Sequence, residues 1–205
     1  MRGLGKKFSV DVILYDVGPN VGALNRTILL DCDYFATPVA ADLFSLRALA
    51  TVGRSLARWI RDWDTVRNLA LPADQVKLLK GRPEYLGYVT SAYKVSSGRI
   101  ATRPHDYWEK KIGPRVRECV VEDLKKVHPS LVPQTSNKIH AIKDFHSLSP
   151  QAQSNGVAIG KLRGYVNPGY YPQVDEAASE FEDLARELLK RMNVKYKAGS
   201  ATAGN

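Results

Sequence analysis

Short apolar runs alternate with helix-like stretches along this chain, and the runs are apolar on both faces. The runs occupy residues 9–16, 34–39, 85–91 and 139–142. A strand that is apolar on both faces is typical of a parallel sheet, because helices cover that kind of sheet on each side. We therefore predict an α/β fold with three layers, in which helices flank a mostly parallel sheet.

Four helix-like stretches separate and follow these runs. They cover residues 21–30, a long stretch from about residue 42, residues 104–127 and residues 176–192. Pro114 is expected to break or kink the third of them, because proline lacks the N–H that a helix interior needs. A length of 205 residues fits one domain, which we place at residues 1–194, with a disordered tail over residues 195–205.

The chain is basic, with a formal net charge of +9. Such an excess favours contact with a polyanion, either nucleic acid or anionic lipid. No apolar run approaches the ~20 residues that cross a bilayer, and the N-terminus lacks the pattern of a secretory signal. The two cysteines are too few for a disulfide framework, and neither they nor the four histidines have the spacing of a structural metal site. We expect a cytoplasmic protein without a membrane partner.

The long helix that begins near Asp42 has two different faces. Its apolar positions recur at three- and four-residue steps: Leu46, Leu49, Gly53, Leu56, Ile60 and Trp63. Four arginines fall within about 60° of one another on the opposite side: Arg47, Arg54, Arg58 and Arg61. Two interpretations stay open for the arginines. They form either an ordinary solvated face or a stripe that contacts DNA phosphates.

Asp16 closes the first apolar run, and the segment Val-Gly-Pro-Asn that follows breaks it. Ligands of open α/β sheets bind beyond the carboxyl ends of the strands, so we predict that Asp16, Pro38 and Ser91 lie along one edge. In nucleotide-hydrolysing proteins a carboxylate at this place lies near a phosphate-bound Mg²⁺. None of the fifteen residues before Asp16 forms the phosphate-binding loop G-x-x-x-x-G-K-[ST].

Several segments, in order, resemble one protein family. Residues 11–25 read Asp-Val-Ile-Leu-Tyr-Asp-Val-Gly-Pro-Asn-Val-Gly-Ala-Leu-Asn, which resembles the Walker B segment of the ParA/MinD family of partition ATPases. Residues 33–46, Asp-Tyr-Phe-Ala-Thr-Pro-Val-Ala-Ala-Asp-Leu-Phe-Ser-Leu, are similar to the next strand and helix start. Residues 86–93, Leu-Gly-Tyr-Val-Thr-Ser-Ala-Tyr, are similar to the strand that leads to the base-binding region. Residues 146–152, His-Ser-Leu-Ser-Pro-Gln-Ala, resemble a later loop, and the resemblance spans about residues 8–165.

The resemblance implies a nucleotide-dependent switch that binds ATP and Mg²⁺, pairs face to face across the nucleotide and binds DNA non-specifically as a dimer. Asp16 would be the catalytic residue that holds Mg²⁺ through water. Ser91 and Ala92 would lie near the adenine, and Pro38 completes the predicted cofactor-binding set. Because the family's phosphate loop is absent from this sequence, we expect that this chain alone does not hydrolyse ATP.

Three functional hypotheses stay open. The chain is part of a longer partition ATPase, or a non-catalytic module that acts on DNA or on a full-length ParA-like partner, or a remnant without function. The family's central first strand is also absent, which would leave sheet edges open beside the strand that carries Asp16. We therefore expect a homodimer, another oligomer or poor solubility.

Overall fold

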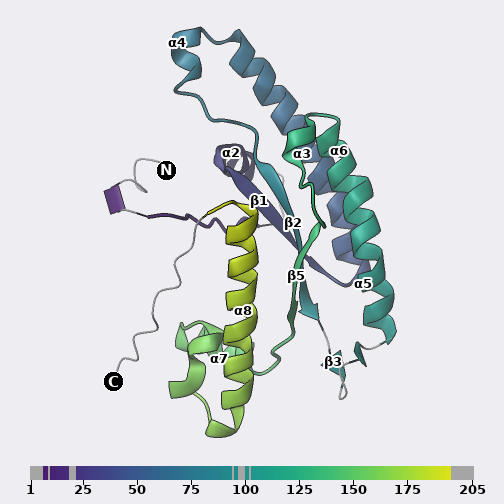
Figure 1. The fold of residues 1–205 in the computed structure, drawn as a ribbon, viewed down its shortest axis with the longest axis vertical. Coiled ribbons are helices and arrows are strands. Elements are labelled where there is room, and N and C mark those ends of the chain that lie inside the picture. The colour runs from purple at the N-terminus through teal and green to yellow at the C-terminus, as the bar shows by residue number, and fades with distance from the viewer. Residues whose placement is uncertain are drawn as a thin grey trace.

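A parallel sheet of three strands forms the centre of the molecule. The computed structural model describes residues 7–8, 10–18, 22–93, 95–96, 100–101 and 103–194. The sheet has the order β1 (Tyr34–Ala40), β2 (Glu84–Tyr93), β5 (Lys138–Lys143), and both pairings are parallel. Helices flank this sheet (Figure 1), so the predicted α/β class is confirmed. The predicted tail at residues 195–205 lies outside the described part of the chain.

β2 is the middle strand, which explains why its sequence is apolar on both faces. Tyr85, Leu86 and Tyr88 are all buried, as expected for a strand with helices above and below it. β1 and β5 lie on either side of β2. Pro38 sits in β1, on an outer strand, where a missing N–H costs no hydrogen bond if it faces outward.

Three helical segments cover one face of the sheet. They are α3 (Leu43–Leu69), α5 (Arg103–Val116) and α6 (Glu122–Lys125). Their apolar faces meet β1 and β2 in the larger of two core clusters. That cluster includes Leu46, Leu49, Leu56, Ile60, Tyr85, Tyr88, Ile112, Val116, Val120 and Leu124.

The other face of the sheet carries α8 (Tyr171–Arg191), and α7 (Leu148–Asn155) lies beside the lower part of α8 (Figure 1). These helices pack against β5 and the segments around it in the smaller core cluster, which contains Ile142, Phe145, Leu148, Ala152, Leu162, Val174 and Ala177. Helices on both faces confirm a three-layer arrangement. α8 begins five residues before its predicted start at residue 176, because Pro172 provides a favourable first turn.

The remaining elements are short. They are α2 (Ala23–Asp31), α4 (Pro72–Gln75), β3 (Val95–Ser96), β4 (Ile100–Ala101), and the 3-10 segments η2 (Pro129–Leu131), η3 (Ile159–Gly164) and η4 (Pro168–Tyr170). Within the described ranges, no helix is both long and apolar enough to span a membrane.

The strand predicted over residues 9–16 is wrong. The described residues 10–18 are in neither helix nor strand. An apolar sequence becomes a strand only when a neighbour satisfies its backbone groups, and no described strand lies beside this segment. As a result Ile13 is 44% exposed and Leu14 is 84% exposed, instead of buried.

The predicted break at Pro114 does not occur. The chain stays helical from α5 through the π-helical turn η1 (Arg117–Val121) into α6. Pro114 removes one backbone donor near the end of α5, and the wider π turn follows three residues later. The buried side chains Val116 and Val120 hold both parts of this helix against α3.

Candidate functional site

Asp16 does not lie at the edge of the sheet where the sequence predicted it. Its side chain is exposed on the unpaired segment of residues 10–18. Desolvation, followed by the nearby Asp31 carboxylate and Cys32, raises the pKa of the neighbouring Tyr15 phenol. Asp31 and Cys32 directly precede the amino end of β1. Because Tyr15 is close to them, its neighbour Asp16 lies near the amino end of β1 and not near the carboxyl end. Its role as a magnesium ligand stays a prediction.

The other predicted cofactor-binding residues lie in the sheet. Pro38 is opposite Val89 inside β1 rather than beyond its end, and it is exposed. Ser91 is opposite Ala40 at the carboxyl end of β1, and Ala92 follows it in β2. Ser91 and Ala92 therefore lie at the predicted edge. Within the residues that the structure describes, no group of three or more His, Cys, Asp or Glu side chains could hold a metal ion.

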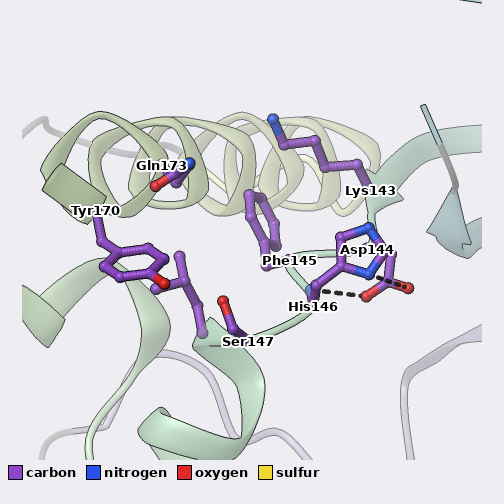
Figure 2. Close-up of a pocket in the computed structure, with 8 residues that line it drawn as sticks. Lys143, Asp144, Phe145, His146, Ser147, Tyr170 and Gln173 are labelled. Atoms are coloured by element: carbon purple, nitrogen blue, oxygen red, sulfur yellow. Dashed lines mark hydrogen bonds and ion pairs between the residues drawn. The ribbon is translucent and has the colours of Figure 1, made fainter. Parts of the chain in front are cut away.

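A pocket of about 220 Å³ opens at the carboxyl end of β5 (Figure 2). It lies between the end of this strand and the start of α8. The lining residues are Lys143, Asp144, Phe145, His146, Ser147, Leu148, Tyr170 and Gln173. The sequence pattern pointed only to the loop that begins at His146, and it gave no signal for the residues of η4 and α8. Only the folded chain brings Tyr170 and Gln173 to β5, which ends 27 residues before Tyr170.

The charges of this pocket are already compensated. Lys143 forms an ion pair with Glu176, and its backbone N–H donates to Glu180 at 3.2 Å. Asp144 accepts a hydrogen bond from the backbone N–H of His146 at 2.9 Å, and its other carboxylate oxygen lies 3.3 Å from His146 Nδ1. A magnesium–triphosphate requires several uncompensated donors around its phosphates. These residues do not fit that group.

The four arginines predicted to share a face of α3 are all exposed. The opposite side of the helix is buried by Leu46, Leu49, Gly53, Leu56, Ala57 and Ile60. Arg54 donates to the carbonyl oxygen of Ala50 at 3.0 Å, and Arg58 lies 3.7 Å from Asp62. Among the described residues, the guanidinium groups of Arg47 and Arg61 form no hydrogen bond or ion pair, and the hydrogen bond that Arg61 accepts from Thr65 uses its backbone carbonyl oxygen. At least two guanidinium groups on this face are therefore free to bind an anion.

The structure adds one more arginine to this surface. Arg26 of α2 lies 3.7 Å from Asp62, the same carboxylate that contacts Arg58. Asp62 thus holds two arginines from different helices on one side of the molecule. Sequence periodicity could not find Arg26, because its place beside α3 depends on the packing of α2.

The fold defines an α/β protein with three parallel strands between two layers of helices. One solved structure, protein DIP2308 from Corynebacterium diphtheriae, is similar to this chain, with a TM-score of 0.52 and 20% sequence identity. The similarity covers 93% of this chain and 53% of DIP2308, so this chain spans about half the length of that protein. At this identity the comparison shows the fold alone. No protein-family model and no curated protein matches the chain.

Proposed function

We propose that this chain is a non-catalytic module that binds DNA through the arginine face of α3. One observation carries the proposal: Arg47, Arg54, Arg58 and Arg61 are all exposed on the side of α3 opposite its buried face. The net charge of +9 supports a polyanionic partner. A role on DNA also fits the cytoplasmic location expected from the sequence.

The helix is firmly held in place, so the backbone positions of its arginines are fixed relative to one another. Asp42 caps the amino end of α3 by accepting a hydrogen bond from the backbone N–H of Ser45 at 2.7 Å. Six buried residues fix the rotation of the helix about its axis. At 1.5 Å per residue, Arg47 and Arg61 are separated by about 21 Å, a length of about six base pairs. Guanidinium groups pair well with phosphate oxygens.

The position of Asp16 favours this binding role over ATP hydrolysis. The carboxylate expected to hold Mg²⁺ lies on an unpaired segment, and the pocket at the end of β5 has no spare positive charge for phosphates. The ParA-like resemblance supports DNA as the polyanion, since that family binds DNA non-specifically. A nucleotide switch in a longer protein stays the second candidate, because DIP2308 has nearly twice the length of the matched region.

The proposal is tested by measuring DNA affinity at two salt concentrations. Four phosphates neutralised by the α3 arginines predict a slope of about −3.6 in log K against log[salt], or about a 10²-fold loss between 50 and 200 mM salt. The double variant Arg47→Gln/Arg61→Gln should bind more weakly and reduce the slope by about 1.8. Scrambled DNA of the same length should bind as well as any chosen sequence, because phosphate contacts carry no sequence information.

The matched control is Lys161→Gln/Lys190→Gln, which removes the same charge from exposed lysines of η3 and α8. Its DNA affinity should stay close to that of the parent chain. Equal losses in the two double variants would reduce the effect to net charge and contradict the α3 interface. If the chain does not shift the electrophoretic mobility of DNA even at low salt, the proposal is wrong.

A further inference from the structure

The outer edge of β1 has no strand paired to it in the part of the chain that the structure describes. The carbonyl oxygen of Asp33 accepts a hydrogen bond from the N–H of Glu84 at 2.9 Å, so residue 33 faces β2. Strand residues alternate in the direction of their backbone groups, so Tyr34, Ala36 and Pro38 face away from β2. No described strand lies on that side. An exposed strand edge of this kind is a template for another strand.

The same chain contains an unpaired segment that suits this edge. We call residues Val10–Leu14 the arm. Val10 is 47% exposed, Ile13 is 44% exposed and Leu14 is 84% exposed. Valine and isoleucine are typical strand residues, and the burial of exposed aliphatic side chains is favourable. The arm therefore has a sequence typical of a strand but pairs with no strand of the described chain.

The base of the arm is attached to α2, and the arm itself extends away from its own sheet (Figure 1). The carbonyl oxygen of Gly18 accepts a hydrogen bond from the Asn25 side chain at 2.7 Å. Tyr15 lies near Asp31 and Cys32 at the other end of α2. Residues 15–18 thus run alongside α2, and the residues before them project outward. An arm in this position is well placed to reach a second molecule.

We propose that two copies of this chain form a dimer by exchanging arms, with Val10–Leu14 of each copy pairing on the outer edge of β1 of its partner. The two contacts are equivalent, so the dimer is closed and leaves neither β1 edge free. The outward groups are the N–H of Tyr34 and Ala36 and the carbonyl oxygens of Tyr34, Ala36 and Pro38. Pro38 has no N–H, so the outward pairing groups end at residue 38, and the edge from Tyr34 to Pro38 is five residues long, like the arm.

This dimer is independent of the proposed DNA binding, because it uses β1 and the arm and leaves the arginines of α3 exposed. It also differs from pairing across a nucleotide, because it requires no ligand. The two proposals can therefore fail separately. Arm variants change the oligomeric state, and arginine variants change DNA affinity.

The test measures molecular mass by light scattering over micromolar to submillimolar concentrations, without nucleotide. The chain should be a dimer that dissociates on dilution, and Leu14→Lys should convert it to a monomer with an unchanged circular dichroism spectrum. Leu69→Lys is the matched control, since Leu69 is 82% exposed at the far end of α3 and Leu14 is 84% exposed. Leu69→Lys should leave the dimer intact.

A crosslink then identifies the contact. One copy carries Leu14→Cys and the other carries Ala36→Cys, each in a Cys32→Ser background, and the two copies have different tags. Mild oxidation should join the two tags in one disulfide-linked species. A chain that is monomeric at every concentration, a dimer that Leu69→Lys weakens as much as Leu14→Lys does, or a Leu14→Cys/Ala36→Cys double variant that forms its disulfide only within one chain would each overturn the proposal.

Discussion

Gly53 lies so close to Cys119 that a Cβ atom on Gly53 would be 1.8 Å from the Cys119 carbonyl oxygen. This contact is where α3 crosses the π-helical turn η1. The neighbouring atom belongs to the backbone, so no side-chain rotation can relieve the overlap. The glycine in the buried face of α3 is therefore required by the close approach of the two helices.

Replacing Gly53 with alanine should destabilise the protein. Overpacking costs about 1–3 kcal/mol, although the better helix propensity of alanine returns up to about 1 kcal/mol. Because the overlap is with a carbonyl, the two helices must separate, and we expect a net loss. Urea unfolding measures it. Gly164→Ala is the control, since nothing lies within 4 Å of a Cβ there. A Gly53→Ala variant as stable as the parent would contradict this prediction, because it would mean that the chain relieves the overlap at no net cost.

Two threonines of neighbouring strands should respond in opposite ways to valine. Thr90 is fully buried in β2, and its hydroxyl has no hydrogen-bond partner among the described residues. Thr90→Val removes an unpaired polar group, so the free energy of unfolding should rise, by about 1 kcal/mol. Thr37 of β1 instead shares a hydrogen bond of 2.8 Å with the Tyr85 hydroxyl.

Thr37→Val is therefore the matched substitution, and it should destabilise by about 1–3 kcal/mol because the Tyr85 hydroxyl loses its partner. Tyr85 is only 1% exposed, so water cannot easily replace that bond. Thermal or urea unfolding of both variants compares the signs directly. A loss of stability in Thr90→Val would mean that a bound water or another group satisfies its hydroxyl.

The sheet could be predicted where local sequence decides the outcome. The strand predicted at residues 34–39 is β1 (Tyr34–Ala40), because its residues favour strands and β2 satisfies their backbone groups. The segment of residues 9–16 has an equally apolar sequence, yet its described part pairs with no strand. Strand formation depends on a partner strand that is often distant in the sequence, and periodicity contains no information about that partner.

The same limit applies to the candidate sites. The arginines of α3 could be placed on one face because a single helix has a fixed period of 3.6 residues. Arg26 joins them only through the packing of α2, and Tyr170 reaches the end of β5 only after α8 has folded back. The predicted position of Asp16 was wrong because it required a strand over residues 9–16, and the described part of that segment does not form one.

Arg191 should be one of the most important polar side chains for stability. Its guanidinium group donates to the carbonyl oxygens of Leu86 at 2.8 Å, Ser136 at 2.7 Å and Lys138 at 2.9 Å. The side chain is only 12% exposed, so few waters can replace these bonds. Arg191→Met should destabilise the protein by about 2–4 kcal/mol in urea unfolding.

The control for this change is Arg186→Met, five residues earlier in α8, where the arginine is 54% exposed and pairs with Glu182. An exposed pair contributes about 0–1 kcal/mol, so this variant should stay close to the parent. If the two variants lose the same amount of stability, the carbonyl contacts of Arg191 contribute nothing beyond a surface ion pair.

Arg191 should also control the titration of Glu187. A hydrogen bond from Arg191 Nε at 2.8 Å lowers the pKa of the Glu187 carboxyl, and the smaller effect of burial opposes it. The folded-state pKa is therefore below the unfolded value of about 4.3. The stabilisation by the ionised carboxylate is fully present above that pH and is lost as pH falls through the folded pKa.

An NMR titration should find the Glu187 midpoint below that of an ordinary glutamate, and Arg191→Met should raise it. The stability difference between the parent and Arg191→Met should also shrink on acidification through this range. A midpoint that Arg191→Met leaves unchanged would assign the lowered pKa to other charges, such as Lys190.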